Sequence, residues 1–465
     1  MTTPVILWFR RDLRLADNPA LVAAAATGPV IPLFVIDPVF FATAGHARQA
    51  FLVDGLRALG RSIGGRLVVR HGDPAVVVAA VVADTGARLV LAAHDYGPYG
   101  TRRDAAVTAG LSSSGAALTF VDSAYAVAPG TVVKADGSPY AVFTPFRRAW
   151  EQAGWRSPVP APDEVEWLGD PEVTCEGYPT VLAPAATLPP AGEDAADQLM
   201  EEFLARRVDG YAEARDRPAV DGTSRLSPYL RFGMIHPRQL LARLGDDPDQ
   251  ATFRSELCWR EFYADVLHRR PDTAWAPLRP ELAGLVVDTD AGASDRFAAW
   301  CRGETGYPIV DAGMRQLLAT GWMHNRVRMI TASFLVKDLH LPWQWGARHF
   351  MRLLVDGDLA SNNHGWQWAA GTGTDAAPYF RVFNPVLQGE RFDPDGSYVR
   401  RWIPELAGVA DRDVHQPWRS GRGQPLGYPG PMVDHGVERA EALARFAAAT
   451  RARDDRAPRG PAGSR

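Results

Sequence analysis

Cysteine is scarce in this sequence. The 465 residues include only three, Cys175, Cys258 and Cys301, and these are widely separated. Three scattered cysteines exclude a disulfide framework and a cysteine-ligated zinc site. We therefore expect a cytoplasmic protein with no resident metal ion.

Long apolar runs are missing too. No run approaches the roughly 20 residues that a membrane-spanning helix requires. The N-terminal residues MTTPVILWFRRDLR also lack the basic region and long apolar stretch of a secretory signal peptide. We therefore expect no association with a membrane.

Lysine is almost absent. Of the 50 basic residues, 48 are arginine, and only Lys134 and Lys337 are lysine. The formal net charge of −4 argues against a uniformly basic nucleic-acid-binding surface. A local basic groove remains compatible with this balance, because binding depends on where the charges lie. The composition, 46% hydrophobic and 22% charged, is typical of a soluble globular protein, and the length favours two domains.

The first 125 residues alternate apolar runs with helical periods. The apolar runs predict buried parallel strands at 4–9, 30–36, 67–70, 88–93 and 118–121. Helical segments are expected between them, at 19–26, 47–63, 74–83 and 102–112. Asn18 with Pro19 and Asp73 with Pro74 are helix-start signals for two of them. The pattern predicts a doubly wound, Rossmann-like α/β domain over residues 1–125.

The turn after the first strand contains no glycine. Its sequence is Arg10-Arg11-Asp12-Leu13-Arg14, so a dinucleotide pyrophosphate could not approach the backbone there. The arginines form either a surface salt-bridge cluster or a ligand site. No G-x-G-x-x-G motif is visible after a strand, which argues against an ordinary oxidoreductase with a second nucleotide cofactor.

The rest of the chain differs in composition. Residues 126–196 are rich in Pro, Gly and Ala and predict an inter-domain connector with one short helix near 144–153. Helical periods dominate residues 197–450, and ten of the fourteen tryptophans lie from Trp259 onward. We expect a larger all-α domain there, followed by a disordered tail at 451–465.

Residues 356–385, DGDLASNNHGWQWAAGTGTDAAPYFRVFNP, are the most informative run. They combine carboxylates, amides, two tryptophans and an arginine among aromatics, with no nucleophile–base pair and no set of metal ligands. Tryptophan offers a large π surface, and asparagine offers both a donor and an acceptor. The combination favours a site for a flat, redox-active ring; a buried aromatic core is the alternative.

This run resembles the flavin-binding signature of the DNA photolyase/cryptochrome family. Residues 307–337 (YPIVDAGMRQLLATGWMHNRVRMITASFLVK) and 221–228 (DGTSRLSP) resemble the same family in the same order. The type most resembled is the class I cyclobutane pyrimidine dimer photolyase. The resemblance implies a monomeric, FAD-dependent carbon–carbon lyase that repairs UV-damaged DNA with light. A cryptochrome-like blue-light sensor and a (6-4) photolyase are the alternatives.

The resemblance implies an FAD site in the α-helical domain. From the residues alone, the stretch before Pro228 is either a capped turn or an anion site at a helix start. The residues expected to bind FAD are Tyr211, Thr223, Ser224, Arg225, Leu226, Ser227, Arg260, Asp356, Gly357, Asp358 and Asn362. Asn362 matches the asparagine that faces flavin N5. His364 departs from the family, where many relatives have glycine.

Two helices are expected to carry the lesion-binding residues. The first, near 252–267, presents Glu256, Trp259, Arg260 and Tyr263 on one face, which without the resemblance is an ion pair beside core aromatics. The second is expected to open at Gly321. The residues implied to contact a flipped-out dimer are Glu256, Trp259, Asn325 and Met329, and those implied to contact DNA are Arg215, Trp259, Arg326, Trp368, Arg381 and Gln388.

On the second helix Trp322, Asn325 and Met329 are expected to share a face. A tryptophan and methionine stripe of this kind is usually part of a core. His324 stands alone, whereas a (6-4) enzyme is expected to carry a histidine pair. This difference favours the dimer enzyme.

The resemblance also implies an electron relay and an antenna chromophore. Trp366 and Trp343 match its inner and middle relay tryptophans, but the outer position falls at Asp290. Trp345 and Trp300 are candidates to replace the missing donor. Asp37, Arg48 and Asp95 match an antenna site for a deazaflavin (8-HDF) better than one for methenyltetrahydrofolate, although Gly97 stands where an acidic ligand is often found.

Overall fold

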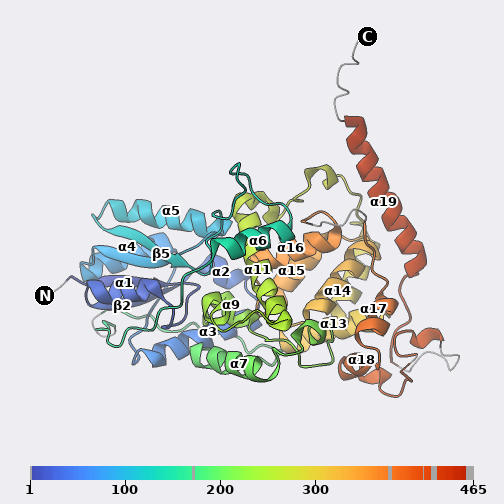
Figure 1. The fold of residues 1–465 in the computed structure, drawn as a ribbon, viewed down its shortest axis with the longest axis horizontal. Helices are drawn as coiled ribbons and strands as arrows, with labels where there is room; N and C mark the ends of the chain where they lie inside the picture. The colour runs from blue at the N-terminus through green and yellow to red at the C-terminus, as the bar shows by residue number, and fades with distance from the viewer. Residues whose placement is uncertain (1–2, 170–172, 375–379, 412, 420–426, 457–465) are drawn as a thin grey trace, which may run out of the picture. The chain divides into compact units, whose positions relative to one another are not determined.

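The computed structural model describes residues 3–169, 173–374, 380–411, 413–419 and 427–456 (Figure 1). The chain divides into two compact units that are each discontinuous in sequence. The first contains Met1–Ala214, Gly222–Pro271 and Met351–Ser361, and the second contains Arg215–Asp221, Asp272–Phe350 and Asn362–Arg465. The domain boundaries expected near residues 125, 196 and 450 stay predictions.

The first unit is built on a five-stranded parallel sheet. Its strands are β1 (Val5–Phe9), β2 (Val30–Ile36), β3 (Val68–His71), β4 (Leu89–His94) and β5 (Ala117–Ser123), in the order β3-β2-β1-β4-β5. This is the doubly wound topology that the sequence predicts. The strand order reverses between β1 and β4, and ligands of such sheets bind outside the carboxyl ends of the strands at this point.

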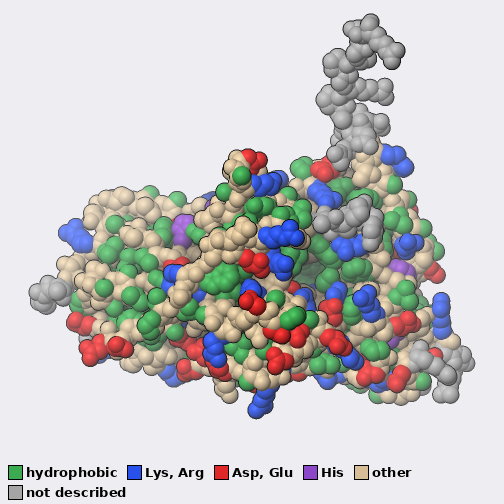
Figure 2. All heavy atoms as spheres, viewed as in Figure 1, with side chains coloured by type: hydrophobic (Ala, Val, Ile, Leu, Met, Phe, Trp, Pro, Cys, Tyr) green, Lys and Arg blue, Asp and Glu red, His purple; other side chains and the backbone are tan. Residues whose placement is uncertain are grey.

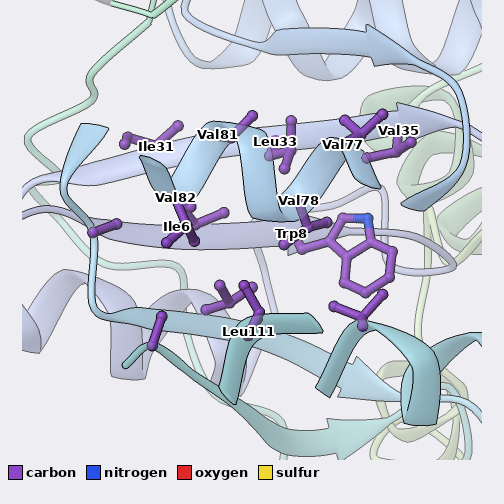
Figure 3. Packing of buried hydrophobic residues seen from close by; sticks show 14 of the residues in the cluster. Ile6, Trp8, Ile31, Leu33, Val35, Val77, Val78, Val81, Val82 and Leu111 are labelled. Atoms are coloured by element: carbon purple, nitrogen blue, oxygen red, sulfur yellow. The ribbon is translucent and has the colours of Figure 1, made fainter. Parts of the chain in front are cut away.

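Helices connect the strands. They are α1 (Pro19–Thr27), α2 (Pro38–Thr43), α3 (His46–Ser62), α4 (Pro74–Thr85) and α5 (Pro98–Ser112); α2 was not expected. The side chains of Asn18 and Asp73 cap α1 and α4, with proline in the first turn of each, as predicted. The core on one face of the sheet joins Ile6 and Trp8 of β1 to Val78 of α4 and Leu111 of α5 (Figure 3).

The remaining helices of this unit are α6 (Phe143–Ala153), α7 (Glu193–Arg206), α8 (Tyr211–Ala214), α9 (Ser227–Phe232), α10 (Pro237–Leu241) and α11 (Pro248–Arg269). The helix expected near 144–153 is α6. Glu261, buried on α11, accepts hydrogen bonds from the backbone N–H of Ala126 at 2.5 Å and of Val127 at 3.0 Å, and from Trp150 Nε1 at 2.6 Å. One carboxylate thus ties the start of the expected connector and α6 to α11.

His236 caps α10 from a buried position. Its Nδ1 accepts the backbone N–H of Arg238, and its Nε2 donates to the carbonyl of Ser123 at 3.0 Å, so the ring is a neutral tautomer. The Asp17 carboxylate lies 3.2 Å from Nδ1. Burial nevertheless lowers the pKa of His236 to about 3.

The His236 ring should make the protein sensitive to acid. An unfolded histidine binds a proton near pH ~6.5 while the folded one does not, so stability should fall as the pH drops from that value toward 3, by up to about 1.4 kcal/mol per unit. Urea unfolding at pH 7 and pH 5 measures this slope. His236→Asn keeps a capping side chain that cannot titrate and should show a smaller slope. Equal slopes in the two proteins would contradict the assignment.

The second unit is helical. It is formed by α12 (Ala291–Arg302), α13 (Pro308–Thr320), α14 (Asn325–Lys337), α17 (Pro385–Phe392), α18 (Ser397–Trp402) and α19 (His435–Arg456), with most of α15 (Trp343–Leu353) and α16 (Leu359–Ala370). α13 packs against α12, α14, α17 and α18. No helix in the described ranges combines the length and apolarity needed to cross a bilayer. Helix α19 extends to Arg456, into the expected tail, and residues 457–465 lie outside the described residues.

One predicted helix start is wrong. Gly321 ends α13 with a left-handed conformation, φ 64°, and its N–H returns to the carbonyl of Leu317. The next helix, α14, begins at Asn325 with His324 as its N-cap. Trp322 therefore lies in the connection between two helices, not on a face shared with Asn325 and Met329. A glycine at this spacing is a stronger signal for a helix end than for a start.

Candidate cofactor and nucleic-acid sites

The Asp356-Gly357-Asp358 turn is held by arginines and a serine of the first unit. Arg11 donates to Asp358 Oδ2 at 2.8 Å, Arg231 Nε donates to the Gly357 carbonyl at 2.8 Å, and Ser227 Oγ donates to Asp356 Oδ2 at 2.6 Å. A Cβ at Gly357 would come 2.2 Å from Arg48 Nη1, so a larger residue there would displace the Arg48 guanidinium.

Asp358 stays ionised in this setting. Burial alone would raise its pKa, but Arg11, Arg231 and Arg260 hold the pKa well below its usual range. The turn therefore places an ionised carboxylate, paired with arginine, just before α16. Both carboxylates already have partners within the protein, a feature that the spacing of the sequence did not predict.

The expected pyrophosphate loop precedes a short helix. Thr223 and Ser224 are half-buried, and Arg225 is exposed with φ 54°. Ser227 opens α9, which has only six residues. Tyr211 is buried on α8 and packs edge-on against Phe203 and Phe253. The loop and Tyr211 belong to the same compact unit as the Asp356–Asp358 turn.

Helix α11 carries Glu256, Trp259, Arg260 and Tyr263, all half-buried. Phe143 stacks on the Trp259 indole with ring centroids 3.6 Å apart and an interplanar angle of 7°. A further ring can therefore stack only on the other face of Trp259. Phe143 was missed, because it lies far away in the sequence.

The Arg260 guanidinium on α11 is engaged inside the first unit. It donates to the carbonyls of Ala124 at 3.0 Å and Leu230 at 3.2 Å and lies over the ring of Tyr125. From the residues alone, the alternative to a ligand role was an exposed Glu256–Arg260 ion pair. The bonds to the two carbonyls show that Arg260 positions α11 against neighbouring segments.

Asn325, Arg326 and Met329 lie in the first two turns of α14. Asn325 is exposed and Met329 is half-buried. Arg326 makes a two-pronged ion pair with Asp216, at 2.7 and 2.8 Å, and lies over the Phe392 ring at 4.4 Å. A phosphate that contacts Arg326 must therefore compete with Asp216, a residue that the motifs do not include.

Asn362 on α16 has a defined amide orientation. Its Nδ2 donates to the carbonyl of Ala347 at 3.1 Å and to Asn363 Oδ1 at 2.9 Å. Asn363 is itself oriented, because its Nδ2 donates to the carbonyl of Ala274. Exchanging the oxygen and nitrogen positions of either amide would place its oxygen against another acceptor oxygen, with no hydrogen between them. Asn362 therefore offers its Oδ1 as an acceptor, which suits an N–H donor on a bound ring.

Two residues that follow on α16 are buried. Trp366 lies so close to α15 that a Cβ at Gly346 would come 2.1 Å from its indole. Its ring contacts Phe350 at 5.0 Å and Trp300 at 6.0 Å. His364, the departure from the family pattern, is fully buried, with Nε2 3.4 Å from Thr273 Oγ1.

Arg381 stacks over the Trp368 ring at 5.0 Å. Its carbonyl accepts from Lys337 Nζ, and the Lys337 ammonium lies over Phe380 at 4.2 Å. Gln388 is half-buried on α17, and Arg215 is half-buried in the second unit. The part of the signature run at 375–379 lies outside the described residues.

Over the face shown in Figure 2, basic and acidic side chains are interspersed, as the net charge of −4 leads one to expect. Within the described residues, no group of three potential ligands could hold a metal ion.

The comparisons with known proteins agree with this geometry. The model for the DNA photolyase domain matches residues 5–163, and the model for the FAD-binding domain of DNA photolyase matches residues 253–448. Deoxyribodipyrimidine photo-lyase from Halobacterium salinarum is 41% identical, covering 97% of this chain and 99% of the relative; that from Streptomyces griseus is 43% identical, covering 96% and 98%. The chain belongs to the DNA photolyase family.

Solved photolyase-family structures have the same fold. A bacterial class III photolyase from Agrobacterium tumefaciens superposes with a TM-score of 0.86 at 38% identity, covering 97% of this chain and 98% of the other. An archaeal photolyase from Sulfolobus tokodaii, described with two FAD molecules, gives 0.84 at 30%, covering 96% and 100%. A cryptochrome from Synechocystis gives 0.86 at 27%, covering 94% and 98%.

In this photolyase-family chain a cavity of about 280 Å³ lies within the first unit, at the carboxyl ends of β1 and β2. Asp37, Arg48 and Asp95 all line it. Asp37 accepts from Tyr99 Oη at 2.7 Å and caps α2. Arg48 donates to the carbonyl of Met351 at 2.6 Å, and burial lowers its pKa to about 10. The cavity lies at the edge of the sheet where doubly wound sheets bind ligands, and Asp95, just after β4, extends it toward the point where the strand order reverses.

Four further arginines line this cavity: Arg10, Arg11, Arg103 and Arg231. Arg10 Nη2 and Arg11 Nε are buried and have no hydrogen-bond partner within the described part of the chain. Arg10 and Arg11 come from the turn after β1, which the sequence left open between a salt-bridge cluster and a ligand site. The salt bridges are present, because Arg10 pairs with Asp104 and Arg11 with Asp358, and a ligand role for the turn stays a prediction.

Proposed function

We propose that this chain repairs cyclobutane pyrimidine dimers in DNA with light, as a FAD-dependent deoxyribodipyrimidine photo-lyase. The observation that carries this proposal is identity above 40% over nearly the full length to relatives of that name. When bound and reduced, FAD supplies one electron to the dimer and takes it back after the ring splits. We also expect a monomer that acts in the cytoplasm.

The residues present fit an FAD. Tyr211, Thr223–Ser227, Arg260 and Asp356–Asp358 would hold it, and Asn362 would offer its oriented Oδ1 to the ring. Of these, Arg260 and Asp358 are fixed by protein contacts, so they would act through positioned charge without rearranging. The proposed lesion pocket needs no general acid–base pair, and Glu256, Trp259, Asn325 and Met329 would bind and orient the dimer.

The test is repair of a defined oligonucleotide. Chemically reduced, FAD-loaded protein is illuminated with DNA that contains a cyclobutane dimer, and restored thymines are counted. A parallel oligonucleotide carries a (6-4) lesion, and a dark sample serves as the control. Light-dependent loss of the cyclobutane dimer is expected; no loss with fully reduced protein would refute the enzyme and favour a blue-light sensor. The fold alone does not separate these two functions, since the cryptochrome superposes equally well.

Glu256→Ala should lower the repair yield per photon several-fold while leaving FAD bound. The expected cause is loss of a hydrogen bond to the dimer as it gains charge. Glu151→Ala removes a more exposed glutamate on α6 and is the matched control. Quantum yields are compared at equal flavin reduction. If Glu256→Ala repairs as well as Glu151→Ala, Glu256 has no role in repair.

We also propose that the cavity of the first unit holds the antenna chromophore and that a deazaflavin fits it better than a folate. Apolar walls such as Trp8 and Phe40 suit a planar ring, and the unpartnered nitrogens of Arg10 and Arg11 suit an anionic or carbonyl-bearing edge. Fluorescence transfer to FAD after reconstitution with deazaflavin or methenyl-folate tests this. Transfer from folate alone would show that the assignment is wrong, and Arg48→Ala should weaken deazaflavin binding.

Phosphate contacts by Arg215, Arg326 and Arg381 would supply much of the affinity for DNA, with Trp368 and Gln388 beside them. Affinity should therefore fall as salt rises. The ion pair of Arg326 with Asp216 supports a role in tuning this affinity, because the guanidinium must be shared between the carboxylate and a phosphate.

A further inference from the structure

An aromatic path leads from Trp366 to Trp345 inside the second unit. Trp366 contacts Trp300 edge-on, with ring centroids 6.0 Å apart. Trp300 stacks on Phe297 at 5.9 Å, and Phe297 contacts Trp345 edge-on at 5.4 Å. Three indoles are thus connected through ring contacts, and the Phe297 ring lies between Trp300 and Trp345.

The position expected for an outer tryptophan does not lie on this path. Asp290 caps α12, and its Oδ1 accepts the backbone N–H of Ala293 at 2.7 Å. Trp343 is 6% exposed and makes no ring contact with any aromatic residue that the structure describes. Its role as middle donor stays a prediction from the resemblance.

Trp300 and Trp345 differ in access to water. Trp300 is completely buried, and its Nε1 donates to the carbonyl of Thr331 at 3.2 Å. An oxidised Trp300 therefore has no direct contact with solvent to which it could release its proton. Trp345 is half-buried at the start of α15. Its radical cation can lose the indole proton to water, which stops the hole from returning.

We propose that Trp345 is the terminal electron donor of this protein and that Trp300 connects it to Trp366. The proposal rests on the proposed function, because it needs an oxidised, light-excited flavin as the acceptor next to Trp366. It assigns to Trp345 the place that Asp290 leaves empty in the family's relay.

Trp366 gives one electron to the excited flavin, Trp300 gives one electron to oxidised Trp366, and Trp345 gives one electron to oxidised Trp300. The Trp345 radical cation then releases its Nε1 proton to water. A small-molecule thiol in solution returns one electron and one proton to the neutral Trp345 radical. The net transfer is one electron from thiol to flavin.

The experiment is transient absorption after a light pulse on FAD-loaded, oxidised protein. Parent protein should show a deprotonated tryptophan radical that persists until the thiol reduces it. Trp345→Phe should lose this long-lived signal and recombine at least tenfold faster, and Trp300→Phe should do the same. Trp275→Phe, which removes a tryptophan that is 61% exposed and outside the path, is the matched control and should behave like the parent.

The outcomes separate the possible routes. A long-lived radical in Trp345→Phe equal to that of the parent would overturn the proposal. A normal signal in Trp300→Phe with loss of signal in Trp343→Phe would overturn the connection through Trp300. Repair by chemically reduced parent protein is measured alongside, since it tests the proposed function without using the path. If the parent fails to repair DNA, while the long-lived radical is present in the parent and lost in Trp345→Phe and Trp300→Phe, the repair activity alone is refuted.

Discussion

Replacing Arg11 with methionine should lower the free energy of unfolding by about 3–5 kcal/mol, the cost of leaving a buried carboxylate without its partner. Arg11 and Asp358 are 2.8 Å apart, with side chains 22% and 13% exposed. Methionine fills much of the same volume but cannot neutralise the charge. Urea unfolding at pH 7 measures the loss.

The loss should depend on pH. Arg11, Arg231 and Arg260 depress the pKa of Asp358 against the effect of burial. A carboxyl group whose pKa is lowered in the folded state stabilises that state at pH values above its unfolded pKa of about 3.9. This contribution disappears as the pH falls below that value. The difference between parent and Arg11→Met should therefore shrink below pH ~4.

Two controls separate charge from packing. The double variant Arg11→Met with Asp358→Asn removes both charges of this ion pair and should recover much of the stability, since Arg231 and Arg260 keep their hydrogen bonds to backbone carbonyls. Arg57→Met breaks an exposed ion pair with Asp54 and should cost less than about 1 kcal/mol. If the double variant is as unstable as Arg11→Met, the loss comes from packing and not from the Asp358 charge.

Asn362→Asp should lower the flavin midpoint potential for the step that forms the anionic reduced ring, by roughly 60 mV or more, equivalent to a tenfold change for one electron. A carboxylate beside the ring disfavours further negative charge. The aspartate also cannot make the two hydrogen bonds that Asn362 Nδ2 donates to the Ala347 carbonyl and to Asn363 Oδ1. One of its carboxylate oxygens would therefore lie against the Ala347 carbonyl oxygen. Spectroelectrochemical titration of FAD-loaded protein gives the potential.

Asn384→Asp is the matched control for this titration. Asn384 caps α17 by accepting from the backbone N–H groups of Val386 and Leu387, and aspartate caps equally well. It adds the same charge to the same unit without touching Asn362. A potential unchanged in Asn362→Asp, or shifted equally in both variants, would remove the assignment of Asn362 to the flavin ring.

The amino-acid sequence by itself determined the α/β domain and much of its local detail. Buried strands are recognised from apolar runs, and helix starts at Pro19 and Pro74 from caps that act on the next three residues. All five strands lie within two residues of their expected positions. Strands and helix starts depend on residues that are close together in the chain, so they can be predicted from the pattern of the sequence. The motif order was likewise enough to place the chain in the photolyase family.

Only the tertiary structure decided which distant residues meet. Phe143 covers Trp259, Asp216 holds Arg326, and five arginines converge on one cavity, although no local pattern pairs them. Trp345 and Trp366 are connected through rings on α12, because a buried aromatic contacts whatever the fold packs against it. Gly321 ends one helix where the sequence suggested a start. Such contacts follow from packing between elements far apart in the chain, which the spacing of residues within one segment does not encode.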